Sequence, residues 1–178
     1  MLLREWRTGD RRALDELIPI IYAELHRLAD AHLRRERADH TFRPTELVGE
    51  LYLRLADDQP EVLDRVHFFG LASKMMRQIL VDHARRRNAV KRNMGERPVA
   101  LDDASVGIER PDAMIALDDA LSALEKLDER KARAIEMHYF GGLTHDEIAT
   151  VLDVHVNTVG RDLRLGQAWI KRHITDQG

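Results

Sequence analysis

The sequence contains no cysteine, which excludes a disulfide framework and any metal site built on thiolates. No apolar run approaches the ~20 residues that are needed to cross a bilayer. The N-terminus, MLLREWRTGD, carries acids where a signal peptide needs a long apolar stretch. We therefore expect a cytoplasmic protein with no membrane segment.

Patterns that form strands are also scarce. No stretch shows sustained alternation of β-branched and polar residues, whereas Leu, Ala, Arg and Glu, which suit helices, are plentiful. Glycine and proline are sparse, with 10 and 5 residues among 178. A chain of this length can form either one domain with a sizeable core or two small ones. The sequence predicts an all-α fold of two small helical domains.

The charged residues are distributed unevenly, although the formal net charge is only -3. Residues 1–93 contain 18 Lys and Arg against 15 Asp and Glu, and residues 94–127 contain 3 against 8. Residues 128–178 are nearly balanced, with 7 against 8. The densest cluster is RRRNAVKR at residues 85–92, with five cations in eight positions. This asymmetry indicates an anionic partner for the first part of the chain.

Three helices are predicted in the first part of the chain. The first follows Asp10, a suitable N-cap, and Pro19 is expected to kink or split it because proline has no N–H and crowds the preceding turn. The second begins near Thr45, and the third runs from about residue 66 to residue 92. We place the first domain at residues 1–93.

Residues 94–111 have paired acids, glycines and prolines and no helical period, which predicts a flexible acidic linker. Helices are then expected near residues 112–127 and 128–140, the second of them stopped by Gly141 and Gly142. A further pair of helices follows. We place the second domain at residues 112–178.

The third predicted helix has an apolar face and a cationic face when it is drawn at 100° per residue. The cationic face, interrupted only by Val81, consists of Lys74, Arg77, Gln78, Arg85, Asn88 and Arg92. Asp82 is the only acid between residues 74 and 92, whereas a solvated helix face usually mixes charges of both signs. The cationic face suits the phosphates of a DNA duplex, and a solvated helix face is the alternative interpretation.

The segment that is most specific for one structural motif is LTHDEIATVLDVHVNTVGRDLRLGQAWIKRH, at residues 143–173. Thr144 and Glu147 form a predicted capping box, and Asp153 stands where a tight turn needs left-handed backbone angles. Val159 suits packing of the second helix on the first, and Gly166 indicates a close approach of two helices. The pattern is that of a helix-turn-helix, although a plain αα-hairpin fits it as well. The face opposite Val159 carries Asn157, Arg161, Arg164 and Lys171.

Catalytic patterns are not found. The paired acids at residues 102–103 and 118–119 are adjacent, so their side chains point apart. The nine histidines show no ligand spacing on one helix face, and no glycine-rich phosphate loop occurs. We therefore expect no catalytic residue, no metal and no cofactor.

Three segments, in this order and spacing, resemble the extracytoplasmic-function (ECF) group of bacterial RNA polymerase sigma factors, in the sigma-70 family. They are TELVGELYLRL (45–55), FFGLASKMMRQILVDHARRR (68–87) and LTHDEIATVLDVHVNTVGRDLRLGQAWI (143–170). The resemblance covers nearly the whole chain. It implies sigma domain 2 in residues 1–93, sigma domain 4 in residues 112–178, and promoter-specific initiation of transcription with core RNA polymerase.

The resemblance also implies three sets of contact residues. The clamp of the largest polymerase subunit would be bound by Glu46, Leu47, Glu50, Leu51 and Arg54. The minus-10 promoter element would be bound by His67, Phe68, Lys74, Arg77, Gln78, Arg85, Arg86, Arg87, Lys91 and Arg92. The minus-35 element would be bound by His155, Asn157, Thr158, Arg161, Arg164 and Lys171. The flap of the second-largest subunit and an anti-sigma protein are further implied partners.

Three positions depart from the usual sequence pattern of the family: Leu71, Gln78 and His155 stand where tryptophan, asparagine and serine, respectively, are common. These departures leave the promoter sequence open. Two other functions also remain open from the residues themselves. One is an autonomous helix-turn-helix regulator that binds palindromic DNA unaided, and the other is an adaptor that holds a protein partner through apolar helices.

Overall fold

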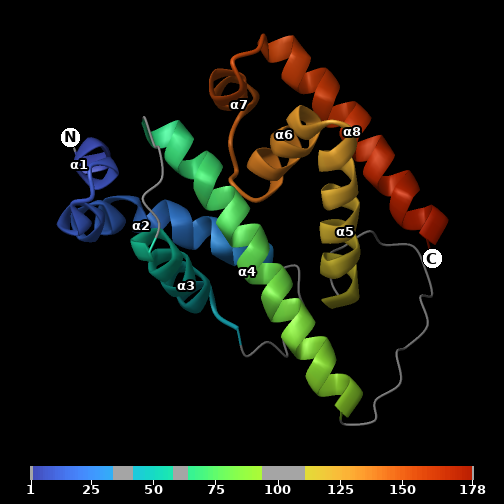
Figure 1. The fold of residues 1–178 in the computed structure, drawn as a ribbon, viewed down its shortest axis with the longest axis horizontal. Helices are drawn as coiled ribbons and strands as arrows, with labels where there is room; N and C mark the ends of the chain where they lie inside the picture. The colour runs from blue at the N-terminus through green and yellow to red at the C-terminus, as the bar shows by residue number, and fades with distance from the viewer. Residues whose placement is uncertain (1, 34–41, 58–63, 94–110, 178) are drawn as a thin grey trace.

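The computed structural model describes residues 2–33, 42–57, 64–93 and 111–177, and in these residues the chain forms eight α-helices and no strand (Figure 1). This confirms the all-α prediction. The first half contains α1 (Leu2–Arg7), α2 (Arg11–Leu33), α3 (Pro44–Asp57) and α4 (Arg65–Asn93). The second half contains α5 (Pro111–Leu127), α6 (Glu129–Tyr139), α7 (His145–Leu152) and α8 (Val156–Gln177). The predicted linker lies outside the described residues, except for Pro111.

No helix in the described ranges has both the length and the apolar character that crossing a membrane requires.

The α2 helix begins as the sequence predicts but is not split. The Asp10 carboxylate accepts a hydrogen bond from the Arg12 N–H at 2.9 Å, as expected of an N-cap. The helix then continues through Pro19 as one element, so of the two predicted effects, a kink or a split, the split was wrong. Leu14 and Leu25, on either side of the proline, are buried and stabilise both segments of the helix.

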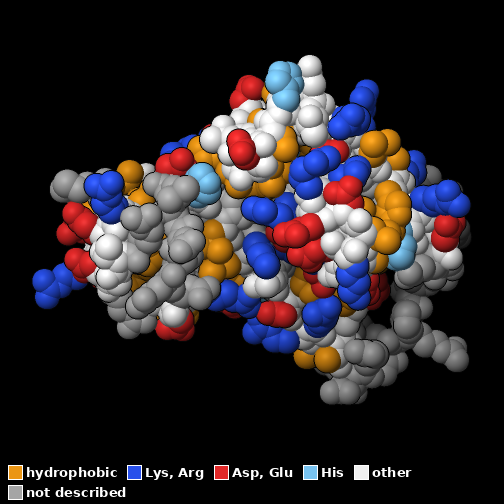
Figure 2. All heavy atoms as spheres, turned by 45° about the horizontal axis from the view of Figure 1, so that its top comes forward, with side chains coloured by type: hydrophobic (Ala, Val, Ile, Leu, Met, Phe, Trp, Pro, Cys, Tyr) orange, Lys and Arg blue, Asp and Glu red, His pale blue; other side chains and the backbone are white. Residues whose placement is uncertain are grey.

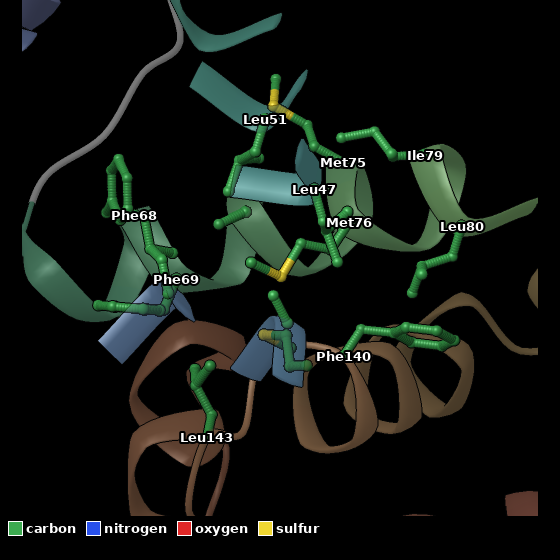
Figure 3. Packing of buried hydrophobic residues seen from close by; sticks show 14 of the residues in the cluster. Leu47, Leu51, Phe68, Phe69, Met75, Met76, Ile79, Leu80, Phe140 and Leu143 are labelled. Carbon is green, nitrogen blue, oxygen red and sulfur yellow. The ribbon is translucent and has the colours of Figure 1, made fainter. Parts of the chain in front are cut away.

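The short helix α1 was not predicted, because its six residues are too few to show a helical period. It is held by Trp6, whose buried ring packs edge-on against Phe68, with the ring centroids 5.9 Å apart. The core of this half also includes the α3 residues Leu47 and Leu51 and the α4 residue Met76 (Figure 3).

The C-terminal helix pair has the predicted helix-turn-helix geometry. Thr144 and Glu147 form the capping box that starts α7. Asp153 ends this helix in the left-handed conformation, with φ 51° and ψ 51°. Val159 is fully buried where α8 packs on the other helices. A Cβ on Gly166 would lie 2.5 Å from Ile135 Cδ1, so the predicted close helix approach is with α6.

Helix α4 packs against both halves of the molecule. It runs between α2 and α3 on one side and the helices α5, α6 and α7 on the other (Figure 1). The buried apolar residues of the two halves form one continuous cluster. Val81, which interrupts the cationic face, is only 2% exposed. Both faces of α4 are therefore covered along this part of its length.

Replacing Asp153 tests the geometry of the turn. Asp153→Gly should increase the free energy of unfolding by about 0.5 kcal/mol, because glycine adopts left-handed angles without steric cost. Asp153→Val should decrease it by about 1 to 2 kcal/mol, since a β-branched side chain is strained there. Urea unfolding followed by circular dichroism measures both changes. Equal stabilities for the two variants would contradict the left-handed turn.

Candidate nucleic-acid and polymerase interfaces

The α8 helix presents an exposed polar face at its N-terminal end. His155 lies just before the helix, and its Nδ1 accepts a hydrogen bond from the Asn157 N–H at 3.2 Å, so an imidazole serves as the N-cap. Thr158 is half-buried. The other predicted minus-35 residues are exposed: His155, Asn157, Arg161, Arg164 and Lys171. The structure therefore brings this predicted set together on one solvent-facing surface.

The opposite face of α8 is anchored by a buried carboxylate that sequence reasoning missed. Asp162 is fully buried and accepts a hydrogen bond from Arg130 Nε on α6 at 2.7 Å. This bond raises the pKa of Arg130. The only feature of the sequence that indicates the burial of Asp162 is its position next to the packing residues Val159 and Leu163. The ion pair fixes the rotation of α8, and with it the direction of the exposed face.

One part of the cationic face of α4, around Arg77, is covered by α5 and α6, whereas Lys74, Gln78 and Arg85 stay exposed. The Arg77 guanidinium donates three hydrogen bonds: from Nε to Asp118 at 2.9 Å, from Nη1 to Glu136 at 2.9 Å and from Nη2 to the Ser122 hydroxyl at 3.0 Å. Its side chain is only 11% exposed. Arg77 is therefore enclosed by protein oxygen atoms in this conformation.

Two further residues of the cationic face have partners on α5. Arg85 Nη2 donates to Asp118 at 3.0 Å, and Asn88 Nδ2 donates to Asp112 at 2.5 Å. The pairing runs from Ser122 back to Asp112 as α4 advances from Arg77 to Asn88, so the two helices are antiparallel. Figure 2 shows basic and acidic side chains intermixed across the middle of the molecule.

Glu136 is a buried acid within this contact. Burial raises the pKa of Glu136 above its ordinary value, although the nearby Arg77 opposes the change. Removing the charges of Arg77 and Glu136 from water is costly, so this ion pair contributes more to the position of the helices than to net stability. Loss of one partner would leave the other buried without compensation.

The remaining residues predicted to bind the minus-10 element differ in exposure. Lys74 and Gln78 are exposed, and so is Arg86, which lies 3.7 Å from a Glu50 carboxylate oxygen. Arg87 is half-buried. His67 is also half-buried, with its Nδ1 2.9 Å from an Asp64 oxygen. The Lys91 and Arg92 side chains lie outside the described residues, although the α4 backbone includes them.

Phe68 is in the core and not at a surface. It is only 1% exposed and packs against Trp6 and Phe69. The family resemblance placed it in the minus-10 set, where an aromatic ring could stack on an unpaired base, whereas the helical period predicts a core position. Its burial instead makes it a support for the N-terminal turn of α4 in this conformation.

The predicted polymerase-binding residues on α3 divide between surface and core. Glu46 is exposed and Glu50 is half-buried. Leu47 and Leu51 are fully buried, so they hold the helix in place and do not offer a contact surface. Arg54 donates to Asp82 on α4 at 2.8 Å. Sequence reasoning missed Leu53, which is 62% exposed and could be identified as the leucine that falls off the apolar face of α3.

A groove of about 510 Å³ lies between α3 and α4. Its lining residues are Phe42, Glu46, Gly49, Glu50, Leu53, His83 and Arg86. The His83 ring stacks on Phe42 with the ring centroids 4.3 Å apart, and its buried Nε2 has no hydrogen-bond partner among the described residues. Burial and the charges of Arg86 and Arg87 lower the pKa of His83. The groove therefore combines an apolar floor, a neutral imidazole and two carboxylates.

Within the described ranges, no three His, Asp or Glu side chains are grouped as metal ligands.

Comparison with known proteins gives one result that covers almost the whole chain. No curated protein sequence matches the chain. The family model described as "ECF sigma factor" matches residues 1–176. This match agrees with the helix-turn-helix at residues 144–177 and with the basic helix α4. The chain therefore belongs to the ECF sigma factor family, the non-catalytic RNA polymerase subunits that direct promoter-specific initiation of transcription.

Proposed function

We propose that this sigma factor divides its task among three helices. Helix α8 reads the minus-35 duplex, α4 melts and captures the minus-10 element, and α3 docks on the clamp of the largest polymerase subunit. The C-terminal half also contacts the flap of the second-largest subunit. The observation that carries the proposal is the exposed polar face of α8, held in a fixed rotation by the buried Asp162.

The side chains on α8 suit reading of a major groove. Asn157 is close to the N-terminal end of the helix, the end that helix-turn-helix proteins insert. Asparagine can form a bidentate contact with adenine, and arginine can form one with guanine. Arg161 and Arg164 lie one and two turns further along and are exposed. The face therefore offers both base-reading and phosphate-binding groups.

The surface of α3 suits docking on another protein. Leu53 is a large apolar side chain exposed beside the carboxylates of Glu46 and Glu50 and the groove under them. An apolar anchor surrounded by charged groups is the usual composition of a small protein interface. The acids favour a partner with basic residues at this place.

The cations of α4 suit a nucleic-acid backbone once they are released from α5. Arg77 and Arg85 already bind carboxylate oxygens in this structure, and arginine binds phosphate oxygens with the same fork of N–H groups. Lys74, Arg86 and Arg87 extend the basic surface along the same helix. This arrangement supports binding to the promoter where its strands separate.

The division of the chain follows the same proposal. Residues 1–93 act as sigma domain 2, residues 94–111 as the linker and residues 112–178 as sigma domain 4. The protein works in the cytoplasm, where its polymerase and promoter are found. An anti-sigma protein is a further partner in this proposal, with the cationic face of α4 and the groove beside Leu53 as surfaces that it would cover.

Leu53→Ser tests the polymerase contact. The affinity for core RNA polymerase should fall about tenfold to hundredfold, because burying a leucine contributes about 1.5 to 3 kcal/mol. Ile20→Ser, which removes another exposed apolar residue, 70% exposed on α2, is the matched control. Retention of core polymerase on the tagged protein and run-off transcription from a fragment library measure the effect. A wild-type chain that occupies an operator unaided and never retains polymerase would refute the proposed function.

Arg85→Ala combined with Arg87→Ala tests the role of α4 in melting. Open-complex formation should fall and become more sensitive to salt, because two cations near the phosphates are lost. Initiation from a template melted in advance should be much less affected. Since Arg85 also binds Asp118, its loss also removes one of the contacts between α4 and α5. Faster opening in the double variant would therefore contradict a role in promoter binding.

Arg161→Ala tests base reading by α8. If the guanidinium forms a bidentate base contact, binding should weaken by about 1 to 3 kcal/mol and discrimination at one base pair should be lost. Arg172→Ala, on the same helix and also exposed, is the control. Transcription from a library of minus-35 sequences measures the change. An equal loss on every sequence would identify a phosphate contact instead.

A further inference from the structure

We propose that Arg54 on α3 orients the Gln78 amide on α4, so that the NH2 group of the amide faces the promoter. In this orientation Gln78 favours a base with a keto oxygen, guanine or thymine, at one position of the minus-10 element. Arg54 is then a positioning residue for DNA reading and not a contact to the polymerase clamp. The inference rests on the proposed function, in which α4 binds this element.

The Arg54 guanidinium bridges α3 and α4. Its Nη2 donates a hydrogen bond to the Asp82 carboxylate at 2.8 Å, and its Nη1 donates one to Gln78 Oε1 at 3.4 Å. The short bond to Asp82 is assisted by the two charges and fixes the position of the guanidinium. Because the guanidinium is a rigid planar fork, fixing one arm also directs the other arm at Gln78.

The contact is built on a fixed packing of α3 against α4. A second ion pair joins the same two helices one turn away, where an Arg86 nitrogen lies 3.7 Å from a Glu50 oxygen. The core beneath these pairs is formed by fully buried residues of both helices: Leu51, Leu55 and Ile79. The position of the Arg54 guanidinium relative to Gln78 therefore follows from the packing of two helices, and not from the two side chains alone.

Arg54 determines which end of the Gln78 amide points outward. A guanidinium has N–H donors and no acceptor, so it pairs with the amide oxygen and not with the amide NH2 group. With Oε1 directed at Arg54, the two N–H groups of Nε2 remain to bind another molecule. Gln78 is exposed, so DNA can reach these N–H groups. The residue therefore acts as a donor, whereas an unrestrained glutamine is both donor and acceptor.

Gln78 is also the amide of the cationic face that is open to a base. The other amide of this face, Asn88, is half-buried and donates to Asp112. Lys74, one turn before Gln78, is exposed and can bind a phosphate. Phosphate contacts position a protein on DNA but carry no sequence information directly, whereas contacts to base edges do. Among these three residues, Gln78 is therefore the one that suits the selection of a base.

The orientation of the amide selects a class of base. Guanine and thymine present the keto oxygens O6 and O4 as acceptors, where adenine and cytosine present the amino groups N6 and N4 as donors. The N–H groups of Gln78 can bond to a keto oxygen but not to an amino group. Glutamine usually binds adenine through N6 and N7 together, which requires both the oxygen and the nitrogen of the amide. Arg54 opposes that contact because it turns the oxygen toward α3.

A promoter library tests the orientation of the amide. A fragment that the wild-type protein transcribes with core polymerase is randomised across its minus-10 element, and the transcripts are sequenced. The wild-type protein should favour guanine and thymine at one position by about threefold to tenfold, the effect of one hydrogen bond. Arg54→Met keeps a long side chain without donors, and Asp82, which is 49% exposed, then remains hydrated. This variant should lose the preference, because the freed amide can turn and bind adenine.

Gln78→Glu tests the same orientation with a residue of nearly the same shape. The carboxylate can keep the bond from Arg54 while it offers an acceptor, and no donor, to the base. The preference should therefore change from guanine and thymine to adenine and cytosine at the same position. Arg86→Met is the matched control, because Arg86 also joins α4 to α3, through Glu50 and not through Gln78. Its loss should lower transcription equally on all sequences and leave the base preference unchanged.

Retention of core polymerase on each tagged variant separates this inference from the proposed function. Arg54→Met should retain polymerase as the wild-type protein does, and weaker retention would show a clamp contact and overturn the inference. An unchanged base preference in Arg54→Met or in Gln78→Glu would also overturn it, as would a changed preference in Arg86→Met. If the wild-type protein retains no polymerase, the proposed function fails instead. Urea unfolding verifies that the variants are folded, and Gln78→Glu, at an exposed position, tests the amide without altering the packing.

Discussion

The arrangement of the two halves depends on one buried cation. Arg77 on α4 is surrounded by Asp118, Ser122 and Glu136, all from the second half of the chain. A guanidinium out of water is tolerated only where its N–H groups are paired, so the position of α5 and α6 on α4 is strongly specified. The burial of Val81 on the same face follows from this contact, and so does the approach of Arg85 and Asn88 to α5.

The two DNA-facing helices are therefore prepared in different ways. The polar face of α8 is accessible to a partner, because its polar residues are exposed to solvent and the Asp162–Arg130 ion pair holds the opposite face of the helix. The α4 face is partly occupied, because Asp118 of the same chain binds both Arg77 and Arg85, although the Arg85 side chain remains 53% exposed. Exchange of one oxygen partner for another costs less than exposing an unpaired arginine would, since the guanidinium is never left without acceptors.

Local features of this fold could be predicted from the sequence, and contacts between distant segments could not. The capping box at Thr144, the left-handed Asp153 and the small residue Gly166 each follow from backbone chemistry within a few positions, and the structure has all three. The helix α1 is too short to show a period, and the continuity of α2 through Pro19 depends on tertiary burial that outweighs propensity. Phe68, Leu47 and Leu51 were assigned to binding surfaces by the family resemblance alone, whereas the helical period places them on apolar faces, and all three are buried.

The cationic face of α4 shows why the candidate site was only partly predictable. A row of arginines indicates an anionic partner, and carboxylate and phosphate satisfy the same donors, so the residues alone cannot distinguish an internal partner from DNA. Two features of the sequence are consistent with an internal partner. One is Val81 in the middle of the cationic face, and the other is the excess of acids in residues 94–127, with 8 against 3 cations. The structure buries Val81, so the apolar residue within this polar face marks a packed position. Two of those acids, Asp112 and Asp118, lie on α5 and accept hydrogen bonds from side chains of α4.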